Sequence, residues 1–167
     1  FNETKDKIGL LKLLSDNKID ICYEDDKKNN IFMYVASLGN NYIKLFKLVL
    51  NGKKISSIIN EKNSDNENLL LIAIKSGFTK LIDLIFEEVD ILDIEELKSN
   101  SLLEVIINNN LHLVDWFFKM LNLNKIELKD YEIELIKKNS LEHTAIKYLK
   151  DSTKMRELLK NNTFNLE

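Results

Sequence analysis

The residues of this 167-residue chain that could act as nucleophiles or metal ligands are few and far apart. The chain has two histidines, His112 and His143, and one cysteine, Cys22. Zinc sites need closely spaced ligands, as in H-E-x-x-H or in paired cysteines, and neither pattern occurs. A nucleophilic Cys22 would need one of the distant histidines as its base. We therefore predict surface histidines, an unreactive thiol, no metal site and no enzymatic activity; a hydrolase that uses Cys22 is the weakest alternative.

Phosphate-binding loops and nucleic-acid surfaces are equally hard to find. The four glycines are scattered, so no glycine-rich loop could hold a phosphate or a nucleotide cofactor, and we predict no cofactor. The formal charge of -3 gives no electrostatic case for nucleic acid. Three lysine doublets lack the aromatic interleaving of nucleic-acid sites, namely Lys27-Lys28, Lys53-Lys54 and Lys137-Lys138. Residues 61–100 form an acidic block, which is either a solvated loop or a patch for a basic partner.

Nothing in the sequence directs the chain to a membrane. The longest apolar stretches, such as residues 69–74, are far shorter than the roughly 20 residues of a membrane span. The first ten residues lack a signal-peptide core. The absence of proline and the abundance of Lys, Asn and Ile indicate an AT-rich source genome. Because the sequence begins at Phe1, we interpret it as part of a longer chain that is cytoplasmic or delivered into a host cell.

Apolar residues recur at helical spacing in several short stretches, and no stretch has the alternation of a strand. Each stretch is only two to four turns long, so its helix must be stabilised by packing on neighbours. The sequence therefore predicts an all-α fold. The clearest stretches are residues 8–14, 45–49, 80–86, 113–118 and 145–149.

These stretches repeat. Residues 66–86 fall on residues 99–119 when they are moved forward by 33 positions, and their apolar positions then coincide. Residues 29–36 match residues 66–73 at a spacing of 37. A fixed period in this range indicates a stack of similar units. Pairs related by the shift of 33 include Asn68 with Ser101, Leu70 with Leu103, Gly77 with Asn110, and Ile85 with Phe118.

The repeat resembles the ankyrin repeat, whose unit reads D-x-x-G-x-T-P-L-H-x-A-A-x-x-G-H-x-x-x-V-x-x-L-L. Residues 63–78, with Leu81, Ile82 and Leu84 to Phe86, occupy that frame, and residues 26–36 copy its first half. The Pro and the His of T-P-L-H are absent from every copy. Asparagine tolerates a left-handed backbone better than other non-glycine residues, so we expect the substitutions to retain the geometry. Asn29, Asn66 and Ser99 replace the loop glycine; the glycine between the helices survives only at Gly77, with Asn110 and Asn139 elsewhere.

The resemblance implies an ankyrin-like solenoid of stacked helix-turn-helix repeats with projecting β-turn loops. We expect a single domain over residues 1–167. It divides into a truncated N-terminal repeat (1–25), three repeats (26–62, 63–95 and 96–128) and a C-terminal cap (129–167), with one more helix near 151–159. The alternatives are HEAT-like or tetratricopeptide-like repeats and an unrelated helical bundle.

The resemblance also implies a function, since ankyrin arrays bind partner proteins through the concave surface of turns and first helices. We expect a protein partner of unknown identity. The alternative is a repeat domain that positions, targets or inhibits a larger toxin or effector enzyme. Trp116 aligns with Asp83 on the solvent side of a second helix, and we expect it to be buried or half-buried. The expected contact residues are Lys27, Lys28, Asn30, Ser64, Asp65, Glu67, Lys75, Ser76, Lys98, Asn100, Asn108 and Asn109.

Overall fold

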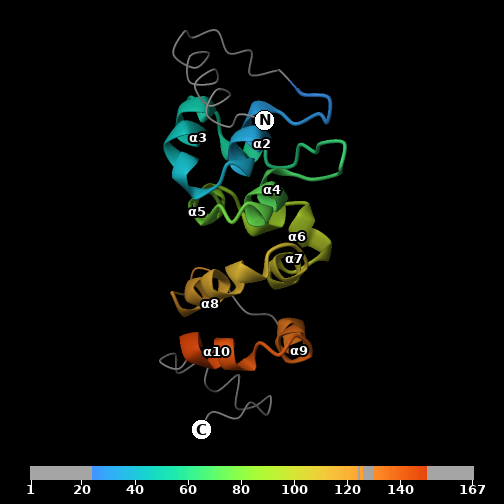
Figure 1. The fold of residues 1–167 in the computed structure, drawn as a ribbon, viewed down its shortest axis with the longest axis vertical. Helices are drawn as coiled ribbons and strands as arrows, with labels where there is room; N and C mark the ends of the chain where they lie inside the picture. The colour runs from blue at the N-terminus through green and yellow to red at the C-terminus, as the bar shows by residue number, and fades with distance from the viewer. Residues whose placement is uncertain (1–23, 124, 126–129, 150–167) are drawn as a thin grey trace.

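The helices form a stack of pairs (Figure 1). The structure is a computed structural model that describes residues 24–123, 125 and 130–149. Over these residues the chain contains helices, turns and one isolated bridge between Glu24 and Asn30, and no strand. The all-α prediction is therefore confirmed for the described part of the chain. Residues 1–23 of the expected truncated repeat (1–25), including Cys22, and the expected helix at 151–159 lie outside it.

Two columns of helices run along the stack (Figure 1). One column contains the first helix of each pair: α2 (Ile31–Ser37), α4 (Leu69–Lys75), α7 (Leu102–Asn109) and α9 (Asp130–Lys138). The other contains the second helices: α3 (Ile43–Leu50), α5 (Thr79–Glu88), α8 (Val114–Asn122) and α10 (Glu142–Leu149). The connections contain α6 (Glu96–Ser99) and the 3₁₀ turns η1 (Asn40–Tyr42), η2 (Ile55–Ser57), η3 (Ile91–Asp93) and η4 (Leu111–Leu113).

The first helices begin in the same way in three successive units. Asn30, Asn68 and Ser101 lie at the N-caps of α2, α4 and α7. Each side-chain oxygen accepts a hydrogen bond from the backbone N–H three residues later, at 2.9–3.0 Å. A capping oxygen satisfies one of the backbone donors that a helix leaves free at its start. The 33-residue register between Asn68 and Ser101 is thus confirmed.

The register of the first unit differs from our expectation by one residue. The caps Asn30 and Asn68 are separated by 38 positions, whereas the apolar pattern predicted a spacing of 37. The residues with positive φ in the two loops are Lys28 (φ 58°) and Asn66 (φ 62°), and they too are separated by 38 positions. The sequence predicts this conformation at Asn29 instead of Lys28. The prediction was wrong because it followed residue type, whereas the hydrogen bonds of the turn determine which residue takes a positive φ.

Asn68 has one more polar atom than its site uses. Its side chain is fully buried, and its Nδ2 donates no hydrogen bond within the described residues. Ser101 caps α7 with a hydroxyl oxygen, so a smaller side chain without an amide can make the same cap. We therefore expect Asn68→Ala to cost about 0.5–2 kcal/mol of stability by removing the cap, and Asn68→Ser to cost less. Urea denaturation of both variants measures the difference, and equal losses would contradict this account of the cap.

A continuous apolar core runs through the stack. Leu70 in α4 and Leu103 in α7 are fully buried, as are Phe46, Phe117 and Phe118 in the second column. Helix α4 packs against α2 on one side and α7 on the other. Each unit therefore buries its apolar residues against its neighbours, as expected of stacked repeats.

Asparagine side chains join successive units at the turn between the two helices. Asn40 Nδ2 donates to Gly77 O at 3.0 Å, and its Oδ1 accepts from Thr79 Oγ1 and Lys80 N at 3.1 and 3.0 Å. Asn110 Nδ2 donates to Ile74 O at 3.0 Å. These amides satisfy backbone groups of the neighbouring unit, a role that the sequence pattern did not reveal.

The conformations expected at the turns between helices need correction. Gly39 (φ 84°) has a positive φ, as Gly77 (φ 66°) does, so a glycine with positive φ occurs in two units. Asn110 instead has an extended φ of -156°, and its side chain reaches the preceding unit. In the last pair Ser140 (φ 55°), one residue after Asn139, takes the left-handed conformation. The substitutions therefore did not all retain the glycine geometry.

The third projecting turn is also absent at the expected place. Ser99, the expected loop residue, ends the short helix α6, and Asn100 after it has a φ of -117°. The hydrogen bonds Leu97 N to Ile94 O and Lys98 N to Glu95 O continue one helical turn through this segment. Only the first two units of the described chain therefore carry the turn that we expected in three.

Candidate functional site

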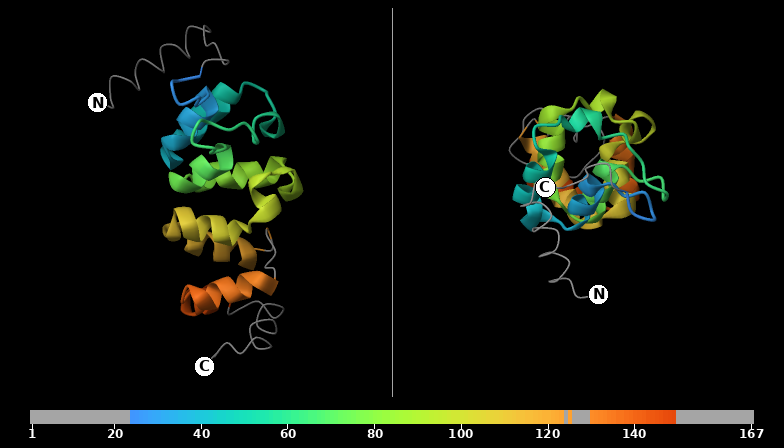
Figure 2. Two further views of the ribbon diagram at one scale, coloured as in Figure 1. Left: turned by 90° about the vertical axis from the view of Figure 1, so that its right-hand side faces the viewer. Right: turned by 90° about the horizontal axis from the view of Figure 1, so that it is seen from above.

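Two hairpin-like turns, residues 24–30 and 61–67, project on the same side of the stack (Figures 1 and 2). In the first turn Asp25 Oδ1 accepts hydrogen bonds from the backbone N–H groups of Lys27 and Asn29, at 2.9 and 2.8 Å. In the second, Asn63 Oδ1 does the same for Asp65 and Glu67, at 3.0 and 2.9 Å. Asp and Asn favour such turns because their short side chains mimic a backbone acceptor.

The two turns are bonded to one another. Ser64 N donates to Lys27 O at 2.8 Å, and Asn63 Nδ2 donates to Asn29 Oδ1 at 2.9 Å. The Lys27 ammonium lies 3.3 Å from the Asp65 carboxylate. We call the exposed residues Lys27, Lys28, Ser64 and Asp65 the turn surface. Hydrogen bonds between backbone and side chains of both units hold this surface in one arrangement.

The expected contact residues fall into three groups by exposure. The exposed ones are Lys27, Lys28, Ser64, Asp65, Lys75, Lys98 and Asn108. The half-buried ones are Glu67, Ser76, Asn100 and Asn109, and Asn30 is buried. The first and second turns come together as expected. Lys98, Asn100, Asn108 and Asn109 lie on or beside α6 and α7, and no hydrogen bond among the described residues joins them to the turn surface.

Asn30 and Ser76 stabilise the scaffold. Asn30 caps α2, and its Nδ2 donates to the Glu61 carboxylate at 2.5 Å. The Ser76 hydroxyl lies 2.8 Å from Ala36 O in the preceding unit. The exposed position that we expected for Asn30 is therefore wrong: its polar side chain faces backbone donors and a carboxylate instead of solvent.

Glu67 links the second turn to helix α4. Its carboxylate forms an ion pair with the Lys75 ammonium and accepts a hydrogen bond from Asn63 Nδ2 at 3.1 Å. Hydrogen bonding from Lys75, assisted by that from Asn63, lowers the pKa of Glu67 below its usual range. In the first turn, hydrogen bonds from Asn29 lower the pKa of the Asp25 carboxyl. Both carboxylates are therefore stabilised in their charged forms.

The lowered pKa of Glu67 makes the stability of the second turn depend on pH. A carboxyl whose pKa is lower in the folded state contributes stability above its unfolded pKa of 4.5, and this is lost as the pH falls through the folded value. We expect the denaturation midpoint to fall below pH 4.5, and to fall less steeply in Glu67→Gln. Urea denaturation as a function of pH measures both. Identical profiles for the two proteins would show that the ion pair contributes nothing.

Trp116, which the 33-residue register aligns with Asp83, lies beside that residue in the structure. The indole is half-buried, as expected, and its Nε1 donates to Asp83 Oδ1 at 3.2 Å, which joins α8 to α5. The pattern had aligned the two residues without indicating this contact. The half-buried indole of Trp116 offers little exposed aromatic surface to a partner.

This hydrogen bond provides a spectroscopic test of the stacking, because Trp116 is the one tryptophan of the chain. Asp83→Ala removes the acceptor, and we expect a shifted emission maximum and about 1 kcal/mol less stability. Asp83→Asn keeps an acceptor oxygen and should retain the native spectrum. If Asp83→Ala leaves both the emission and the midpoint unchanged, α5 and α8 do not meet in this way.

Chemically reactive groups do not converge in the described part of the chain. His112 and His143 are exposed, as expected. Among the described residues, no three His, Cys, Asp or Glu side chains are placed to hold a metal ion. No helix within the same residues is long and apolar enough to cross a membrane. Comparison with protein-family models, curated proteins and solved structures gives no match to this chain.

Proposed function

We propose that this chain is an ankyrin-like protein-recognition module that binds a partner protein through the turn surface. The observation that carries the proposal is the bonding of two projecting turns into one polar surface by Ser64 N, Asn63 Nδ2 and the Lys27–Asp65 pair. This surface exposes charged groups of both signs, and binding through it requires no catalytic group.

Three features support the ankyrin-like assignment. Helix pairs stack in two columns (Figure 1). Equivalent residues cap the first helices at a spacing of 33 between Asn68 and Ser101. Polar side chains bond to groups of the neighbouring unit that lie 33 to 40 positions away in the sequence. The bond between the Asn40 side chain and Lys80 N is an example. A stack of this kind supports an exposed surface whose residues can vary without disturbing the core.

The rigidity of the turn surface favours binding. A loop that must become ordered on binding loses conformational entropy, and this loss weakens the complex. Here the backbone of each turn is already fixed by the carboxylate or amide oxygen of Asp25 or Asn63. Lys28 extends from this backbone with no carboxylate partner among the described residues, so its ammonium is free to meet a carboxylate of the partner.

The test compares two variants that leave the net charge unchanged. Lys28→Glu with Asp65→Lys reverses charges on the turn surface. Lys119→Glu with Asp115→Lys makes the same exchange on the exposed side of α8. Each protein and the parent are immobilised and exposed to a host-cell lysate, and retained proteins are identified by mass spectrometry. Binding of each candidate is then measured with purified protein.

We expect a protein that the parent and the α8 variant retain and that the turn-surface variant loses. Far-ultraviolet circular dichroism must show that all three chains are folded. Equal retention by the two variants would contradict recognition through the turn surface. Loss only in the α8 variant would move the binding site to the second helices.

A further inference from the structure

The charges of the chain are separated between neighbouring units. Residues 27–60 contain six lysines and no acidic residue, whereas residues 61–100 contain ten acidic and four basic residues. In the fold these segments are adjacent layers of the stack (Figure 1). The separation therefore places a basic layer beside an acidic layer.

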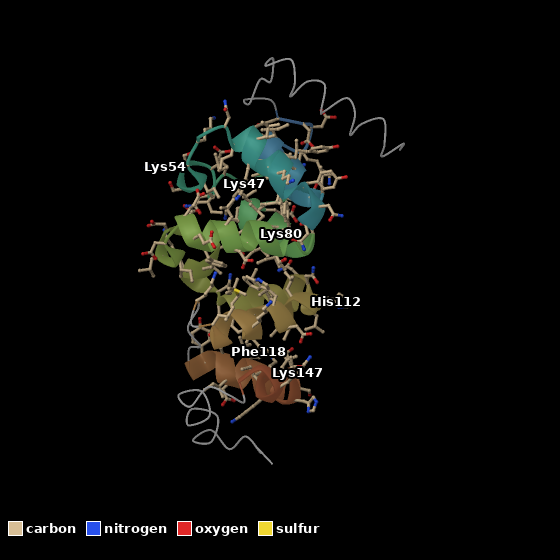
Figure 3. The ribbon with its side chains drawn as sticks, turned by 90° about the vertical axis from the view of Figure 1, so that its left-hand side faces the viewer. Lys47, Lys54, Lys80, His112, Phe118 and Lys147 are labelled. Atoms are coloured by element: carbon tan, nitrogen blue, oxygen red, sulfur yellow. The ribbon has the colours of Figure 1, made fainter. Side chains whose placement is uncertain are left out.

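One side of the basic layer presents unpaired lysines around an exposed leucine. Lys44, Lys47 and Lys54 are exposed, and no carboxylate among the described residues pairs with them. Leu48, in the same helix as Lys44 and Lys47, is 60% exposed. We call these four residues the basic face. Figure 3 shows Lys47 and Lys54 on the side of the stack formed by the second helices.

The acidic layer presents the complementary arrangement. Asp90, Asp93 and Glu95 are exposed in the segment that follows α5, and no lysine among the described residues pairs with them. Leu92, between the two aspartates, is 76% exposed. We call these four residues the acidic segment. It combines negative charge with an exposed leucine, as the basic face combines positive charge with one.

The basic face and the acidic segment lie along the same edge of the molecule. Asn60 Nδ2 donates to Asp93 O at 2.7 Å, and Asn60 Oδ1 accepts from Glu95 N at 3.0 Å, so the loop that follows Lys54 contacts the acidic segment. In Figure 3 the yellow-green segment after α5 projects beside the loop that carries Lys54. Both surfaces can therefore face the same neighbouring molecule.

We propose that two copies of this chain associate side by side and antiparallel, with the basic face of each against the acidic segment of the other. A two-fold axis between the copies forms both contacts at once and closes the assembly as a dimer. Leu48 and Leu92 are buried by the contact, and their removal from water adds to the attraction between the charges. The turn surface is not part of this interface, so the proposal is independent of the proposed function.

Charge exchange between two variants tests this arrangement directly. The basic-face variant is Lys44→Glu with Lys47→Glu, and the acidic-segment variant is Asp93→Lys with Glu95→Lys. Each alone presents like charges to a second copy of itself, so we expect its dimerisation to be at least about tenfold weaker than that of the parent. Mixed together, the two variants are complementary at both contacts and should form a heterodimer.

The measurement is sedimentation equilibrium over a range of protein concentrations at low and at high ionic strength. We expect the parent mass to rise from 19.5 kDa towards twice that value at low ionic strength, and to fall back when salt screens the charges. The matched control is Lys119→Glu with Lys138→Glu. This control changes the net charge by the same amount as the basic-face variant, but at exposed positions of α8 and α9. It should therefore dimerise like the parent.

Three results would overturn the proposal. The parent could stay monomeric at every concentration at low ionic strength, or the mixture of the two variants could fail to associate. Growth of the parent beyond a dimer would exclude the closed two-fold arrangement. Because recovery in the mixture requires both variants to be folded, success there also excludes misfolding as the cause of their separate losses.

Discussion

Truncating Leu70 to alanine is expected to lower the free energy of unfolding by about 2–5 kcal/mol. The side chain is fully buried in α4, which packs against α2 on one side and α7 on the other. Because α2 and α7 enclose α4 from both sides, the cavity left by the truncation cannot collapse freely. The loss of stability therefore exceeds the cost of removing buried apolar surface alone. Urea denaturation followed by circular dichroism gives the value.

Two companion variants make this result specific. Leu103 occupies the equivalent position in α7 and is equally buried, so Leu103→Ala should have an effect of similar size. Lys75 lies in the same helix as Leu70, but its side chain is 46% exposed and forms a surface ion pair with Glu67. Such pairs contribute at most about 1 kcal/mol, so Lys75→Ala should cost clearly less than Leu70→Ala. A neutral Leu70→Ala would mean that the helices do not stack in this register.

Apolar periodicity was sufficient to predict the helical class and much of the stacking register. The buried positions of α4 and α7 recur at the predicted spacing of 33, as Leu70 and Leu103 show. Burial of one helix face is imposed on every unit by its neighbours. A pattern that depends on burial is therefore visible in the sequence even where the polar and turn residues differ between units.

Turns were less predictable, because single hydrogen bonds decide their conformation. The sequence favoured Asn29 as the left-handed residue, but Asp25 accepts hydrogen bonds that fix the turn so that Lys28 has the positive φ. The substitution pattern also implied a third projecting turn near Ser99, where one helical turn forms. When the register of two units shifts by one residue, most apolar positions still coincide. The contacts of a turn, in contrast, all change.

The candidate site was only partly predictable for a related reason. Polar residues in the expected turns were interpreted as surface groups, and this is correct for Lys28 and Asp65. Asn30 and Ser76 have the same polarity but bond to groups within the scaffold. Buried backbone groups need partners, and nothing in a single sequence separates a polar side chain that supplies one from a side chain that faces solvent. The contact between Trp116 and Asp83 required the fold for the same reason.

The second large effect is expected at the turn between α4 and α5, where Gly77→Val should cost about 2–3 kcal/mol. Gly77 has a φ of 66°, and a left-handed backbone costs a residue with a β-carbon about 1–2 kcal/mol. The Gly77 carbonyl also accepts the hydrogen bond of Asn40 Nδ2 at 3.0 Å. A valine that relaxes towards negative φ moves this carbonyl and loses that bond, which is worth about 1 kcal/mol more.

The matched control is Gly77→Asn, which separates backbone conformation from steric crowding. A β-carbon at this position would lie 3.5 Å from Asn110 Nδ2, an ordinary contact, so lack of space is not what excludes a side chain. Asparagine adopts positive φ more readily than valine, and Gly77→Asn should lose clearly less stability in urea denaturation. If both variants lose the same amount, crowding against Asn110 decides the effect. If neither variant loses stability, the turn tolerates another conformation, and its bond to Asn40 does not hold the two units together.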